Sequence, residues 1–232
     1  MRLNNFNDFI KILLASGFSI GGGNDEGIYA IVNHDWQTVP QGSPIIWHTG
    51  DPETDPWEWR VRVLKRGDIS YAKCFFKKSG YITKEFYPYF LALRRGGREF
   101  DDDYADGLIS NHAKRIYDVI REHGELPMEK IKQHGGFVRD DKGRFDSALT
   151  DLQMRLYLTI CGTNRKTNAR GEEYGWNSTT FCTAEKFWEH TDVFERAAKL
   201  DKTEAYEAIR KRVLFLNPTA DEKKIRRFSY GR

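Results

Sequence analysis

A small group of acidic side chains beside a histidine has the residue types that hydrolysis requires. His48, Asp51 and Asp55 all lie in one short segment, with Glu53 between them. A hydrolytic site needs one group that activates water and another that protonates the leaving group, and imidazole and carboxylate side chains supply both. Asp55 also precedes Pro56, a pair typical of a helix start. The three residues are therefore catalytic candidates, with a capped helix as the alternative interpretation.

The remaining reactive residue types form no motif for a metal or a cofactor. Cys74, Cys161 and Cys182 are far apart, and neither a CxxC pair nor an HxxxH or HExxH spacing occurs. The glycines at 21–23 are not in the register of a phosphate-binding loop or a dinucleotide fold. Cys74 lies in an apolar stretch and is expected to be buried and inert. We predict no metal site and no cofactor.

Basic side chains in the second half of the chain indicate contact with nucleic acid. Arginine can bond to base edges and phosphates, and lysine neutralises phosphates. A helix near 145–156 would present Arg144, Gln153 and Arg155 on the face opposite its apolar side, although several aspartates offset these bases. A basic loop at 162–171 follows, and a turn in the first half adds two lysines. The predicted nucleic-acid-binding residues are Lys77, Lys78, Arg144, Arg155, Arg165, Lys166 and Arg170.

The elements that would position these bases follow a recognisable order. Apolar spacing predicts helices near 113–120, 126–131 and 145–156. Strands are predicted near 157–160 and 176–181, and the basic loop joins them. Helix, turn, helix and then a hairpin is the order of a winged helix, which places one helix and one hairpin against a nucleic-acid duplex.

The first half repeats part of this pattern. Helices are predicted near 6–14 and 56–65, with short strands at 45–47 and 69–76. The predicted fold class is α+β and mostly helical, with a winged helix-turn-helix in the C-terminal half and a helix–hairpin, winged-helix-like N-terminal half. We expect domains at 1–100, 108–185 and 186–232, with the acidic segment 101–107 as a connector.

Composition limits the class of protein. The 232 residues are 39% hydrophobic and carry a net charge of +3, enough apolar content for a core and not a disordered composition. Residues 1–110 contain 13 Lys and Arg against 15 Asp and Glu, and residues 111–232 contain 24 against 19. The second half therefore favours an anionic partner. Neither a signal peptide nor an apolar stretch of membrane-spanning length is found, so we expect a cytoplasmic protein with no membrane partner.

Several segments resemble one known family. The relevant stretches are 113–116 (AKRI), 135–137 (GGF), 144–153 (RFDSALTDLQ) and 175–176 (GW), together with 71–76 (YAKCFF) and 87–93 (YPYFLAL). They are similar to the winged-helix proteins related to the AlkZ/YcaQ DNA glycosylases, from about residue 47 onward. The resemblance implies tandem winged helices, a DNA partner and a link to DNA repair. The family's small β-barrel is not expected in a chain of this length.

The resemblance stops short of the family's catalytic pair. The glycosylases of that family remove alkylated bases or unhook crosslinks with a Gln-x-Gln or Gln-x-Asp pair. The glutamines here, Gln37, Gln41, Gln133 and Gln153, form no such pair. The leading hypothesis is DNA binding without catalysis. The alternatives are a diverged glycosylase, in which His48, Asp51 or Asp55 positions the water, and an adaptor that binds a protein partner.

Overall fold

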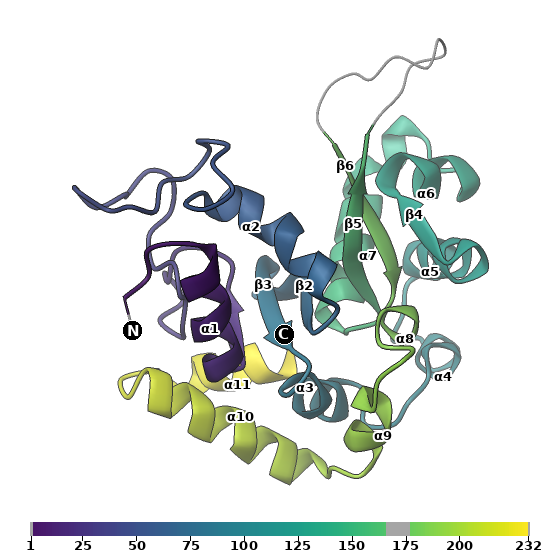
Figure 1. Cartoon of the computed structure of the whole chain (residues 1–232). Helices are drawn as coiled ribbons and strands as arrows, with labels where there is room; N and C mark the ends of the chain where they lie inside the picture. The colour runs from purple at the N-terminus through teal and green to yellow at the C-terminus, as the bar shows by residue number, and fades with distance from the viewer. Residues whose placement is uncertain (1, 166–176, 232) are drawn as a thin grey trace.

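The computed structural model describes residues 2–165 and 177–231 and contains one antiparallel sheet surrounded by helices (Figure 1). The sheet order is β1-β3-β2-β5-β6-β4. Its strands are β1 (Phe18–Ile20), β2 (Ile69–Phe75), β3 (Lys78–Thr83), β4 (Glu125–Pro127), β5 (Leu158–Asn164) and β6 (Ser178–Thr183). The predicted α+β class with a large helical share is confirmed at this level.

The first unit, residues 6–83, contains three of these strands. Its helices are α1 (Phe6–Ser16), α2 (Pro56–Arg62) and the 3-10 turn η1 (Val63–Arg66). Gly17 follows the last residue of α1 and ends the helix in a left-handed conformation, which glycine adopts without steric cost. The apolar sides of α1, α2 and η1 pack on β2 and β3 around the buried Phe9 and Trp59. This unit therefore has an apolar core of its own.

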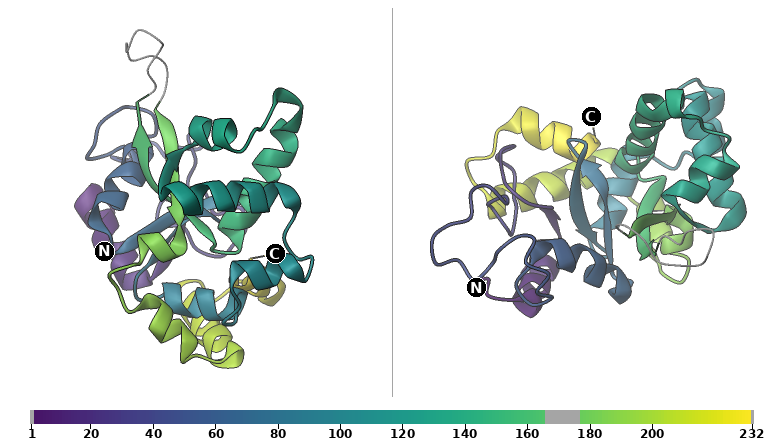
Figure 2. Two further views of the ribbon diagram at one scale, coloured as in Figure 1. Left: turned by 90° about the vertical axis from the view of Figure 1, so that its right-hand side faces the viewer. Right: turned by 90° about the horizontal axis from the view of Figure 1, so that it is seen from above.

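The second unit, residues 111–183, contains the other three strands. Its helices are α5 (Asn111–His123), α6 (Met128–His134), the 3-10 turn η2 (Arg139–Asp141) and α7 (Lys142–Met154). Phe145 and Leu152 of α7 are fully buried beside Ile116 and Ile120 of α5. Seen from above, the helices of the second unit and the N-terminal segment lie on opposite sides of the central strands (Figure 2).

The helices outside the two units cover the lower end of the molecule in Figure 1. They are α3 (Tyr87–Arg94), α4 (Phe100–Ala105), α8 (Ala184–Phe187), α9 (Val193–Ala198), α10 (Lys202–Leu216) and α11 (Glu222–Tyr230). Phe228 of α11 is fully buried and stacks on Phe75 of β2, with ring centroids 4.1 Å apart. The last helix thus completes a core that begins in the first unit.

One arginine ties four segments together. The guanidinium of Arg94 donates hydrogen bonds to the carbonyl oxygens of Cys74 at 2.8 Å and Met154 at 2.7 Å. It also donates to the carbonyls of Phe228 at 2.7 Å and Ser229 at 3.0 Å. These carbonyls come from β2, from the end of α7 and from α11, so both units and the last helix meet at this side chain.

The structure differs from the sequence-based expectations at two places and contains two short strands that the sequence did not predict. The expected strand at 45–47 does not form, because the Ile45 carbonyl is bonded by the His34 ring at 3.2 Å and the Ser43 hydroxyl at 3.1 Å. The expected acidic connector contains helix α4, whose Phe100 stacks on Tyr117 with centroids 3.8 Å apart. The sequence also gave no sign of β1 and β4, which are three residues long and pair at the two edges of the sheet.

Candidate nucleic-acid interface

Helix α7 divides into an exposed beginning and a buried end. Lys142, Arg144 and Ser147 are exposed near its start, while Phe145 faces the core. Neither Lys142 nor Arg144 forms an ion pair with any residue in the described ranges. Both cations are therefore available to an anionic partner. The exposed Asp146 beside them lowers the local positive charge.

The end of α7 is committed to the protein itself. Gln153 was expected on the outward face, but it is 2% exposed. Its side-chain oxygen accepts from the Lys73 backbone N–H at 2.9 Å, and its amide nitrogen donates to the Leu149 carbonyl at 2.9 Å. That prediction was wrong because the end of α7 packs against strand β2, which the apolar pattern of α7 alone does not reveal.

Arg155 is also paired within the protein. Its guanidinium contacts Asp151 at 2.9 Å and lies 4.0 Å from Asp103. A DNA phosphate would have to compete with these two carboxylates. The prediction that Arg155 binds nucleic acid therefore stays open, with a weaker physical basis than for Arg144.

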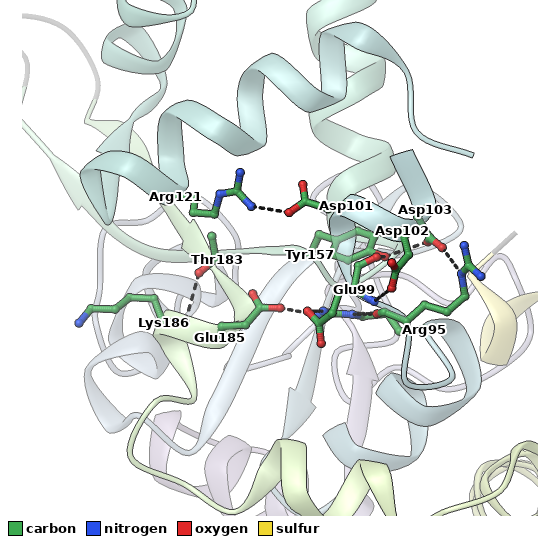
Figure 3. A network of polar contacts seen from close by, with 11 residues as sticks. Arg95, Glu99, Asp101, Asp102, Asp103, Arg121, Tyr157, Thr183, Glu185 and Lys186 are labelled. Carbon is green, nitrogen blue, oxygen red and sulfur yellow. Dashed lines mark hydrogen bonds and ion pairs between the residues drawn. The ribbon is translucent and has the colours of Figure 1, made fainter. Parts of the chain in front are cut away.

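The Asp103 carboxylate belongs to a polar network that links α4 and α8 with Arg95, which follows α3, and with Tyr157, which lies between α7 and β5 (Figure 3). It accepts from the Tyr157 hydroxyl at 2.8 Å and from Arg98 at 2.5 Å. The buried Arg95 pairs with Glu185 at 2.6 Å and with Glu99 at 3.5 Å. Burial raises the pKa of the Tyr157 hydroxyl well above its usual value, and the bond to Asp103 adds to this effect. The charged groups of the network are paired with one another and join separate elements, so we assign it no catalytic role.

The two hairpins differ in what their basic residues contact. In the first unit Lys77 is exposed and has a left-handed backbone, with φ of 62°, while Lys78 pairs with Asp25 at 3.2 Å and Glu26 at 3.6 Å. In the second unit Arg165 is exposed directly after β5. The predicted Lys166 and Arg170 lie outside the described residues.

The catalytic candidates build a loop rather than a shared site. Asp55 is fully buried, and its carboxylate accepts from the backbone N–H groups of His48 at 3.1 Å, Gly50 at 2.9 Å and Trp57 at 2.8 Å. The exposed Asp51 accepts from the Glu53 N–H at 2.9 Å and the Thr54 hydroxyl at 2.8 Å, and these bonds lower the pKa of its carboxyl. Asp55 therefore fixes the turn that enters α2, and its oxygens are occupied by that task.

The sequence did not reveal a basic recess in the second unit. Its lining is Lys132, Phe137, Val138, Arg139, Lys142 and Phe145, and its volume is about 240 Å³. Lys132 comes from α6 and the other two bases from η2 and the start of α7. Arg139 and Lys142 were recognisable as charged residues near a helix start. Lys132 is separate in sequence and joins them only through the turn between α6 and α7.

A comparison with known protein families assigns this chain to a family. The family model described as AlkZ related matches residues 3–230. The chain belongs to the AlkZ-related family. This membership confirms the resemblance drawn from the sequence segments.

Comparisons with individual proteins give a more distant likeness. Among solved structures, this AlkZ-related chain is similar to Streptomyces sahachiroi DNA glycosylase AlkZ, with 12% identity and a TM-score of 0.39. The match covers 75% of this chain and 50% of that chain, so the AlkZ-related chain spans about half the length of the solved one. A comparison with curated protein sequences finds no match.

Three further observations concern metal binding, membranes and the glutamines. Within residues 2–165 and 177–231 of the AlkZ-related chain, no group of three His, Cys, Asp or Glu side chains is placed to hold a metal ion. Among the helices in those same ranges, none has the length and apolar content to cross a membrane. Gln37, Gln41 and Gln133 are exposed, whereas Gln153 is buried.

Proposed function

We propose that this AlkZ-related chain binds double-stranded DNA through a winged-helix module and does not itself remove bases. The module consists of α5, α6, α7 and the β5–β6 hairpin. The observation that carries the proposal is the exposed, unpaired state of Lys142 and Arg144 at the start of α7 within the described part of the chain. In helix-turn-helix proteins the beginning of the second helix contacts base edges.

The arrangement of the second unit supports this orientation. Helix α6 leads through a short turn into α7, and β4 pairs with β6 beside them. Helix α6 lies at the same end of the molecule as the C-terminal end of β5 and the N-terminal end of β6, away from α10 and α11 (Figure 1). One duplex placed against this end could contact the start of α7 and Arg165 together. Membership in a family related to a DNA glycosylase supports a role close to DNA repair.

The state of the acidic candidates supports binding without catalysis. A general base must reach the proton that it removes, but Asp55 is fully buried and already accepts three backbone hydrogen bonds. The His48 ring is 5.1 Å from the Trp57 ring between centroids, and no contact joins it to either aspartate side chain in the described structure. We therefore propose no water-activating role for these residues.

The test is duplex binding measured by fluorescence anisotropy at about 50 and about 200 mM salt. Binding driven by phosphate contacts weakens steeply across this range. Arg144→Glu should lower the affinity about tenfold or more, because it removes a cation and adds a repulsive charge. Lys211→Glu, on the exposed side of α10, introduces an acid at the other end of the molecule and is the matched control. Equal effects of the two variants would contradict the proposed interface.

The same preparation separates the alternatives. Release of a base from alkylated duplex, lost in Asp55→Asn while the fold is retained, would establish a diverged glycosylase in place of the proposal. Absence of duplex binding at 50 mM salt, together with a stable protein complex in pull-down, would establish an adaptor.

A further inference from the structure

The basic recess between α6 and α7 has an aromatic floor and a cationic rim. Phe137 and Phe145 meet edge to face, with ring centroids 4.9 Å apart, and Lys132 Nζ lies 4.8 Å from the Phe145 ring centroid. The outer surface of Phe137 is covered by Arg115, whose guanidinium carbon is 4.3 Å from the ring centroid. The floor is therefore held in place from both sides. Val138 is 66% exposed at the edge, which leaves the recess open to solvent.

The positive charge of this rim is not neutralised inside the protein. Lys132, Arg139 and Lys142 line the recess, and none of them pairs with a carboxylate in the described ranges. The neighbouring Asp141 faces elsewhere, because its carboxylate accepts from the Val138 N–H at 3.1 Å and lies 3.5 Å from the His112 ring nitrogen. Asp140 is exposed and does not line the recess. Three cations around one hollow repel one another unless an anion lies between them.

The size of the recess limits what this anion can be. Pockets for small molecules usually measure about 300–1,000 Å³, whereas this one measures about 240 Å³. Arginine and lysine together suit a phosphate group, which accepts several charge-assisted hydrogen bonds. Aromatic and aliphatic side chains beside the cations suit the apolar edge of the attached sugar. A tetrahedral phosphate at the end of a small apolar slot fits both properties.

We propose that this recess binds a phosphate group of a nucleic acid and so sets the register of the duplex on α7. The inference rests on the proposed function and deepens it. Phosphate contacts fix the position and orientation of a protein on DNA, and base contacts then read the sequence. Lys132 belongs to α6, so the recess joins both helices of the turn to the same phosphate. Arg144 lies two residues after Lys142 on α7, about half a turn away, and so on a different side of the helix. It is then left to face the groove.

The first test compares two triple variants with the same change in net charge. The recess variant removes all three positive charges from the rim through Lys132→Gln, Arg139→Gln and Lys142→Gln. Lys199→Gln, Lys211→Gln and Lys223→Gln remove three exposed cations from α10, α11 and the end of α9. The recess variant should bind duplex at least about tenfold more weakly and lower the slope of log affinity against log salt by about one, as expected for the loss of one phosphate contact. The control should change affinity by less than about twofold.

The second test measures phosphate binding in the recess in the absence of DNA. Inorganic phosphate is titrated into the wild-type chain and the recess variant while backbone amide resonances of residues 137–143 are followed by NMR. We expect saturable shifts in the wild type that vanish in the recess variant. Duplexes ending in a 5′-phosphate or a 5′-hydroxyl then show which phosphate of the DNA the recess binds. Equal affinity for the two duplexes would indicate an internal phosphate, and higher affinity for the phosphorylated duplex would indicate a terminal phosphate.

The outcomes keep the two proposals apart. Duplex binding with the same affinity and salt slope in both triple variants would overturn the recess and leave DNA binding intact. No duplex binding by the wild type would overturn the proposed function, and the phosphate titration would still decide the recess: shifts confined to residues 137–143 would support it, and their absence would sink it.

Discussion

Each unit contributes one half of the sheet, and the two halves have the same strand order when each is read from its outer edge toward the centre. From the outer edge inward, the first unit runs β1, β3, β2 and the second runs β4, β6, β5. In each, a helix precedes a short edge strand, and a helix leads into the hairpin. The units meet where Tyr71 of β2 pairs with Ile160 of β5, next to a 3.0 Å contact between the Ser70 and Thr159 hydroxyls. The chain has thus used one arrangement twice.

The units differ in how they use their charges. In the first, the hairpin turn consists of Phe76 and Lys77, and the adjacent Lys78 is held by two carboxylates. In the second, Lys142 and Arg144 at the start of α7 remain unpaired in the described structure. The same arrangement of helices and strands therefore has Lys78 paired internally in the first unit and presents unpaired cations at the surface of the second, within the described residues. This contrast favours the second unit as the place where a partner binds.

The largest expected effect tests whether the two units are separate folding units. Each of the variants Phe9→Ala and Phe145→Ala leaves a cavity in the core of one unit. Each should lower the free energy of unfolding by about 3–5 kcal/mol. Because Ile160 packs against both cores, both variants should still unfold in one transition. Guanidinium denaturation followed by circular dichroism reports both units. Tryptophan fluorescence weights the first, which contains Trp36, Trp47, Trp57 and Trp59. Separated curves would show that the units unfold independently.

A smaller loss is expected at the side chain that joins the units. Arg94→Met keeps most of the side-chain length but removes the donors to four carbonyl oxygens. We expect a loss of about 2–3 kcal/mol in the free energy of unfolding, since charged donors make the stronger hydrogen bonds of a protein. Urea denaturation measures it. Arg144→Met is the control, and a surface change of this kind should stay within about 0.5 kcal/mol.

The acidic loop of the first unit should behave as a structural element. Asp55→Ala removes the acceptor of three backbone N–H groups and should cost about 2 kcal/mol, at the upper end for the loss of a helix cap. Asp51→Ala, at the exposed side of the same loop, should cost much less. Thermal unfolding of the two variants gives the comparison. Equal losses would mean that Asp55 does not anchor the loop as its contacts indicate.

The smallest effect is expected at the first hairpin. Lys78→Ala should change duplex affinity by less than about twofold, because this lysine is already paired with Asp25 and Glu26. Lys77→Ala changes the neighbouring lysine, which is exposed and has no ion pair within residues 2–165 and 177–231. Comparing the two variants shows whether the position of the hairpin or the pairing of Lys78 limits its contribution to duplex affinity. A loss for Lys78→Ala as large as that for Arg144→Glu would erase the contrast between the units.

The ends of helices could be predicted from the sequence more easily than the contacts between the two units. Gly17, Asp55–Pro56 and Gly124 are local signals, and the structure places helix ends at each of them. Gln153 shows the limit: its spacing on α7 is compatible with an outward face, and only its bond to Lys73 of β2 places it inside. The recess could not be predicted from the sequence for a similar reason, because its lining includes residues of two helices, α6 and α7, that are separate in the sequence. Short edge strands such as β1 carry too few residues for a period to appear.

The burial of Phe228 has a consequence for how the chain is made. Ribosomes deliver a protein from its first residue onward, so β2, which carries Phe75, is synthesised long before α11. Until then the ring of Phe75 lacks its stacking partner, and the Cys74 and Met154 carbonyls lack the neighbours that complete the cluster around Arg94. Part of the apolar surface around Phe75 therefore stays exposed on the nascent chain until α11 has been synthesised. Apolar surface exposed during synthesis is where aggregation and chaperone binding begin.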